Sequence, residues 1–152
     1  MTLLQYASFD VFSDVFNPDQ ISETLGLTPS HVSWRGSRQS SEPAIPRTNI
    51  WSFRASGVGQ ADDQIRQLVD RFEPLADRLQ TLTTDGASAC SISLVRYFGG
   101  AEASTESLGR DEGRRFDGIS IEGFHLDVTL LRRLADLGWS LDVDEYDEND
   151  GH

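Results

Sequence analysis

The sequence predicts one α+β domain in which helices cover one face of a mainly antiparallel sheet. Its elements follow the βαββαβ order of a ferredoxin-like sandwich, with a C-terminal helix-strand addition. Three observations support this. A chain of 152 residues has the length of a single domain, so we expect residues 1–152 to form one. Several segments alternate apolar and polar residues as strands do, and the segments between them repeat apolar residues at helical spacing.

The first strand and helix are predicted from the N-terminal segment. Residues 6–16 are rich in aromatic and β-branched side chains, which favour a strand. Asn17 is the expected helix cap, with Pro18 at the first helical position and Gln20 reaching back to complete a capping box. Gly26 provides the left-handed residue that ends this short helix.

Two strands are expected next, separated by a surface loop. Residues 31–36 form a short strand-like piece, and residues 37–47 are rich in Ser, Pro and Arg. Residues 49–54 alternate cleanly, which places Trp51 and Phe53 on one face of a strand.

The main core helix follows, and Pro74 interrupts its pattern. The helix either kinks there or ends and restarts with Pro74 in a first turn. Residues 90–97 then alternate as a half-buried strand. The apolar stripe of the helix comprises Ile65, Leu68, Val69, Phe72, Leu75, Ala76, Leu79 and Leu82.

The C-terminal third is expected to contain a long loop, a helix and a strand. Residues 99–118 hold few large apolar side chains and predict a long mobile loop, and residues 118–121 predict a short strand. Asp127 is the expected cap of a helix that Gly138 ends. In the final strand, residues 139–146, apolar side chains alternate with carboxylates, and residues 145–152 continue as an acidic tail.

The charge of the chain restricts its partners. The formal net charge is -12, and all 13 basic residues are arginine. A field of this sign repels nucleic acids and anionic membrane surfaces, so we expect neither as a partner. A basic protein partner fits better, although acidity that only aids solubility is the plain alternative. The single cysteine, and the lack of a leader or an apolar segment of membrane-spanning length, suit a reducing cytoplasm.

The sequence contains no catalytic set that we recognise. His31, His125 and His152 have no partner at zinc-ligand spacing, and Cys90 lies in an apolar run typical of a core residue. The glycines of residues 57–59 are followed by two carboxylates, which would repel a phosphate. We therefore expect no metal, no cofactor and no enzymatic activity.

The remaining candidates are surface residues suited to binding. Trp and Arg are enriched at interaction hot spots, and carboxylates on a strand face can meet a basic partner, although core packing and a solvated face are the plain alternatives. Arg54 and Arg96 are candidates for holding an anionic ligand in a pocket. The candidates for partner binding are Trp34, Arg35, Asp142, Asp144, Glu145, Asp147 and Glu148.

Several short segments carry a family likeness: residues 6–9, 16–18, 25–29, 34–36, 49–52, 134–138 and 141–146. Taken in order, they resemble a bacterial family catalogued as domain of unknown function 4279. The longer loop at residues 99–118 departs from what that family leads us to expect. The resemblance implies a small bacterial protein with no established catalytic residues, similar to orphan domains that act as immunity proteins against toxins.

Three hypotheses therefore follow. The leading one is a non-catalytic, immunity-like binding domain that neutralises a basic toxin through its acidic surface. The second is a small-molecule binder or enzyme with an arginine-lined pocket. The third is an accessory domain that self-associates through open sheet edges.

Overall fold

The structure, a computed structural model, describes residues 2–38, 46–56, 59–99 and 124–147. The strands are β1 (Thr2–Ser13), β2 (His31–Ser33), β3 (Asn49–Arg54), β4 (Ser88–Gly99) and β5 (Ser140–Asp147). The helices are α1 (Pro18–Leu25), α2 (Ala61–Phe72), α3 (Ala76–Thr83) and α4 (Val128–Leu137), with a 3-10 turn, η1 (Glu73–Leu75), between α2 and α3. The chain is thus an α+β protein, as predicted.

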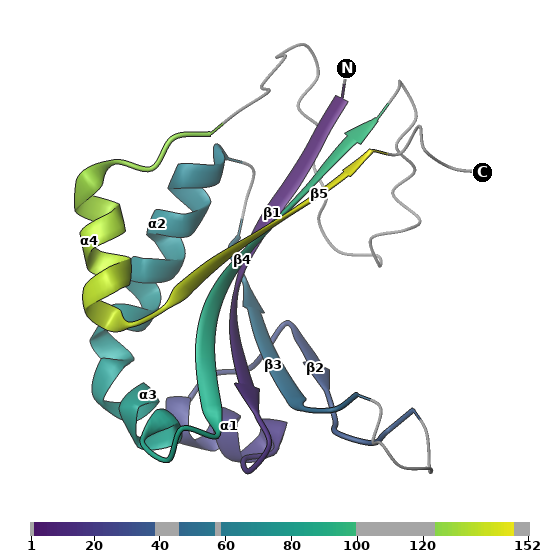
Figure 1. The fold of residues 1–152 in the computed structure, drawn as a ribbon, viewed down its shortest axis with the longest axis vertical. Coiled ribbons are helices and arrows are strands. Elements are labelled where there is room, and N and C mark those ends of the chain that lie inside the picture. Colours follow the sequence, from purple (N-terminus) through teal and green to yellow (C-terminus); the bar gives the residue numbers. More distant parts are fainter. Residues whose placement is uncertain (1, 39–45, 57–58, 100–123, 148–152) are drawn as a thin grey trace.

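In the described part of the chain, the strands form one mixed sheet of five, in the order β2-β3-β1-β4-β5 (Figure 1). Strand β1 lies at the centre and pairs antiparallel with both β3 and β4, and β2 pairs antiparallel with β3. Strand β5 pairs parallel with β4. A parallel neighbour needs a crossover connection, and α4 lies within the segment that joins the two strands.

The core lies between the sheet and the helices, which Figure 1 shows on one side of it. Alternate residues of β1 face this side, including Phe9, which is fully buried. The ring of Phe9 stacks on Phe72 of α2 at 4.0 Å between centroids and meets Trp139 edge-on at 4.8 Å. Trp51 of β3 approaches Phe72 edge-on at 6.1 Å. These aromatic contacts hold α2 against β1 and β3, and they hold Trp139, the residue before β5, against β1.

The predicted start and end of α1 are confirmed. The Asn17 side chain accepts a hydrogen bond of 2.9 Å from the backbone of Gln20, whose side chain accepts one of 2.9 Å from the Asn17 backbone. This is a complete capping box. Gly26 ends the helix with φ of 67°, a conformation that other residues rarely adopt.

Of the two alternatives predicted for the long helix, the structure shows the one in which the helix ends and restarts near Pro74. The helix ends at Phe72, and Pro74 lies in the turn η1 before α3 begins at Ala76. Because proline cannot donate the hydrogen bond of a helix interior, the regular α-helix is interrupted here.

Two strands end earlier than we predicted. Strand β1 ends at Ser13 because the Ser13 hydroxyl accepts hydrogen bonds from the backbones of Val15 and Phe16, which turns the chain away from the sheet. Strand β2 ends at Ser33, and the chain then turns with Gly36 at φ of 73°. Residue 99 of the predicted loop lies in β4, and residues 145–147 of the predicted acidic tail lie in β5. The rest of the predictions for residues 99–118, 118–121 and 145–152 lie outside the described residues.

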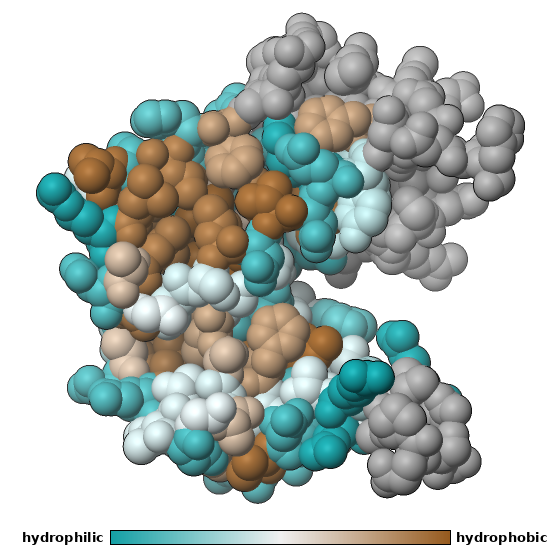
Figure 2. Space-filling model, in the orientation of Figure 1, coloured by the Kyte–Doolittle hydropathy of each residue, from teal (hydrophilic) through white to brown (hydrophobic). Residues whose placement is uncertain are grey.

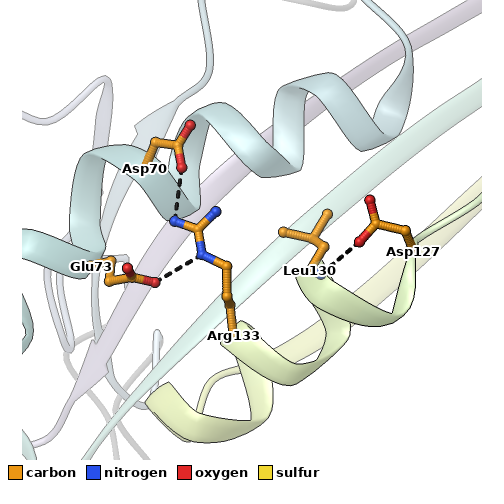
Figure 3. A network of polar contacts seen from close by, with 5 residues as sticks. All are labelled: Asp70, Glu73, Asp127, Leu130 and Arg133. Carbon is orange, nitrogen blue, oxygen red and sulfur yellow. Dashed lines mark hydrogen bonds and ion pairs between the residues drawn. The ribbon is translucent and has the colours of Figure 1, made fainter.

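Helix α4 has the predicted ends, and two sets of ion pairs fasten it to α2 and η1. Asp127 accepts a cap hydrogen bond of 2.8 Å from Leu130, and Arg66 of α2 lies 3.2 Å from the Asp127 carboxylate. Arg133 pairs with Asp70 at 2.8 Å and with Glu73 at 2.9 Å (Figure 3). These contacts fix the position of the helix that precedes β5.

Candidate interaction surface

Strand β5 presents two chemically different faces. By its register with β4, Asp142 and Asp144 lie on the open face, which we define as the face of the sheet away from α1 to α4. Leu141 and Val143 lie on the helix face, where Leu141 packs against the core and Val143 is 39% exposed. The predicted alternation of β5 is therefore confirmed. Both carboxylates are exposed, so the strand offers acidic groups on one side and an apolar group on the other.

Helix α4 adds further exposed apolar side chains near this strand. Val128 and Leu131, one helical turn apart, are 59% and 47% exposed, and Phe124 before the helix is 36% exposed. Figure 2 shows hydrophobic side chains gathered over α4 and continuing towards β5. We give the name α4–β5 surface to these apolar side chains together with the carboxylates on the open face of the same edge strand: Val128, Leu131, Val143, Asp142 and Asp144. Contiguous exposed apolar side chains beside charges are typical of interaction sites.

Strand β5 is also the last strand on its side of the sheet that the described residues form. Within the described residues, β4 is its only strand neighbour, so its other edge has no strand partner there. An edge of eight residues is long enough to pair with another chain. Charged side chains on such a strand discourage unwanted pairing, which is the structural alternative to a binding role for Asp142 and Asp144.

The open face carries a polar network that we did not predict. Asp10 of β1 is only 5% exposed, and its carboxylate accepts hydrogen bonds from Ser93 at 2.6 Å and Ser8 at 3.2 Å. Next to it, Ser91 donates to the Asp142 carboxylate at 2.8 Å. The only sequence signal was the alternation of Ser8 and Asp10 with apolar residues in β1. Asp142 is thus held in place by its neighbour, whereas the structure gives Asp144 no such contact within its described part.

Three tyrosines extend the open face towards the end of β5. Tyr97 and Tyr146 stack at 5.1 Å between ring centroids, and Arg54 lies 4.0 Å above the ring of Tyr6. Burial raises the pKa of Tyr6, the neighbouring Tyr97 adds to this, and the Arg54 charge opposes it only in part. Arg54, a candidate for anion binding, is therefore stacked on an aromatic ring.

Glu145 and Arg96 are paired on the helix face. The Arg96 side chain is 1% exposed, and its Nη1 lies 2.6 Å from Oε1 of the half-exposed Glu145. The Arg96 guanidinium also lies 4.9 Å from the ring centroid of Phe98 and 5.4 Å from that of Phe124. Glu145 therefore lies on the opposite face of β5 from Asp142 and Asp144, and it forms an ion pair with Arg96 of the same chain.

The two groups of predicted partner-binding residues lie at opposite edges of the sheet. Trp34 follows β2 and is 40% exposed. Arg35 donates from its backbone to Asn49 at 2.8 Å, and its guanidinium reaches the Asp14 carbonyl at 3.5 Å. The order β2-β3-β1-β4-β5 puts three strands between this region and β5. The side chain of Asp147, and the whole of Glu148, lie outside what the structure describes.

One family model, Domain of unknown function (DUF4279), matches residues 3–148. The chain belongs to the DUF4279 family. The matched range includes residues 99–118, where we expected a departure from the family. No curated protein and no solved structure matches the chain. Membership in DUF4279 brings no activity with it, because the function of this family is unknown.

One pocket of about 490 Å³ lies in this DUF4279 domain between α3, the start of β4 and the turn from α4 to β5. Its lining includes the apolar Leu79, Cys90 and Trp139 and the carboxylates of Asp77 and Asp136. Neither Arg54 nor Arg96 contributes to the lining, so this pocket is not the arginine-lined site of our second hypothesis.

The described part of the DUF4279 chain offers few reactive groups. Burial raises the pKa of the Cys90 thiol to about 12, so the thiol stays protonated near neutral pH. Among the described residues there is no group of three or more His, Cys, Asp or Glu side chains that could hold a metal ion. No helix in the described ranges is long and apolar enough to cross a membrane.

Proposed function

We propose that the chain is a non-catalytic, immunity-like binding domain of a bacterial cytoplasm, which neutralises a basic toxin protein through its α4–β5 surface. One observation carries this proposal. Strand β5, whose outer edge is unpaired within the described residues, carries exposed carboxylates on its open face and the exposed Val143 on its helix face, in a chain of net charge -12.

The two kinds of side chain would contribute differently to binding. Val128, Leu131 and Val143 can be desolvated by a partner, which stabilises a complex by about 25 cal/mol for each Å² of apolar area buried. Asp142 and Asp144 add little affinity while exposed, but they attract a basic partner and repel an acidic one. The apolar side chains therefore supply affinity, and the carboxylates supply selectivity and a faster encounter.

The arrangement of the strands supports a more specific description of the fold as part of this proposal. The order β2-β3-β1-β4, with antiparallel pairing throughout, is that of a ferredoxin-like unit. In this description, α4 and β5 are an addition to that unit and bring the α4–β5 surface with them.

The test is a quantitative comparison of two charge-reversal variants against a purified partner. The partner is isolated from a bacterial lysate by affinity to the full chain, expressed separately and purified. Its affinity is measured for the wild type, for Asp142→Arg with Asp144→Arg, and for Asp19→Arg with Glu23→Arg. The control pair lies on exposed positions of α1 and changes the net charge equally.

We expect a basic partner whose affinity falls by about a hundredfold or more for the β5 pair, because two attractive charges become repulsive. The α1 pair should change affinity by less than about threefold, since those charges lie at a distance. Circular dichroism establishes that both variants are folded. Equal losses for the two pairs, or a partner that is not basic, would refute the proposed surface.

A further inference from the structure

We infer that the partner binds by adding an extended segment to the outer edge of β5, which has no strand partner among the described residues, as a further strand with alternating basic and apolar side chains. This inference rests on the proposed function and specifies the partner of the same surface. It follows from the backbone of β5, from the order of its side chains and from the charges that they carry.

The backbone supplies the first argument. In a strand paired on one side only, every second residue directs its N–H and C=O groups away from the sheet. Strand β5 has eight residues, Ser140–Asp147, and its outer edge has no strand partner within the described residues. A partner segment of about six residues, the usual length of a strand, can pair along it.

The side chains determine which segment fits. Residues on adjacent strands lie about 5 Å apart on the same face, so a new strand would place its own alternate side chains beside those of β5. On the open face these would meet Asp142 and Asp144, which favours Lys or Arg. On the helix face they would lie beside Val143, which is 39% exposed, and this favours Val, Ile or Leu.

Charge also argues against a second copy of this chain as the occupant. Two β5 strands paired edge to edge would bring Asp142 and Asp144 of one copy close to the same carboxylates of the other. Like charges on neighbouring strands destabilise pairing, and each copy carries a net charge of -12. The opposite edge of the sheet, β2, has only three residues and offers a much shorter ladder.

The experiment uses the full chain and three capped seven-residue peptides. The first alternates Lys and Val and begins and ends with Lys. The second has the same composition in blocks, with two Lys, three Val and two Lys. The third alternates Glu and Val. Affinities are measured by calorimetry, and amide hydrogen exchange along β5 is measured by NMR with and without each peptide.

We expect the alternating Lys peptide to bind about tenfold or more tightly than the block peptide, and the Glu peptide not to bind. Binding should slow the exchange of alternate amides within Ser140–Asp147, because only the outward N–H groups gain partners. The Asp142→Arg, Asp144→Arg variant should lose the preference for Lys.

The two proposals fail in different ways. Equal affinity for the alternating and block peptides, no protection of the β5 amides, or no binding at millimolar peptide would overturn strand addition. If the purified protein partner still binds the wild type and loses affinity with the β5 charge-reversal pair, the proposed function survives that result. If the protein partner binds the Asp142→Arg, Asp144→Arg variant as tightly as it binds the wild type, the proposed surface fails.

Discussion

Replacing Glu145 with alanine should destabilise the protein by about 2 kcal/mol, although Glu145 is half-exposed. The reason lies with its partner. The Arg96 side chain is 1% exposed, its Nη1 lies 2.6 Å from the Glu145 carboxylate, and an arginine cannot release its proton to become neutral. Breaking a fully buried ion pair costs about 3–5 kcal/mol, and a charged hydrogen bond contributes about 1.5–3 kcal/mol. Because water reaches Glu145, whose side chain is 51% exposed, we expect a loss below that of a fully buried pair and within the range of a charged hydrogen bond.

The measurement is urea unfolding at neutral pH, with Asp144→Ala as the control. Asp144 lies next in the same strand, is exposed and has no ion pair in the described part of the chain, so its loss should change the stability by less than about 0.5 kcal/mol. For a slope near 2 kcal/mol per molar urea, Glu145→Ala should lower the unfolding midpoint by about 1 M. Equal midpoints for the two variants would refute the reasoning.

Three further predictions concern the helix caps and the buried thiol. Asn17→Ala should lower the free energy of unfolding by about 1 kcal/mol, and Asn17→Asp should lower it much less, because aspartate also caps. Cys90 should not react with a thiol reagent in the folded protein, since burial raises its pKa to about 12, and it should react once urea unfolds the chain; full labelling without urea would contradict this. The pKa of Asp127 is lowered from 3.8 by the hydrogen bond from the Leu130 backbone and then by Arg66, so the charge stabilises the fold above that pH and ceases to do so as the pH falls through the lowered pKa. Urea unfolding should therefore show Asp127→Asn less stable than the wild type near neutral pH, and the difference should vanish in acid; a constant difference would argue against this cause.

The features that the sequence predicted best depend on a few neighbouring residues. Helices α1 and α4 begin after Asn17 and Asp127 and end at Gly26 and Gly138, as expected, because caps and left-handed glycines act within one helical turn. Pro74 interrupts the long helix for an equally local reason. The alternation within β5 also holds, since it follows from the pleat of a single strand.

The features that the sequence could not predict depend on how distant strands pair. Glu145 meets Arg96 because β5 pairs parallel with β4 in one register, and a shift by one residue would turn Glu145 to the open face. The contact between Asp10 and Ser93 requires β1 and β4 to be neighbours. The distance between Trp34 and β5 follows from the strand order. A single sequence contains no local signal for any of these pairings.

The α4–β5 surface is tested most directly by the rate at which the purified partner associates, measured by stopped flow at several ionic strengths. If exposed carboxylates on β5 attract a basic protein, the wild-type rate constant should fall steeply as salt is added. The variant with Asp142→Arg and Asp144→Arg should associate slowly at low salt, and added salt should not slow it further. Rate constants that are the same for both proteins at every ionic strength would contradict the account.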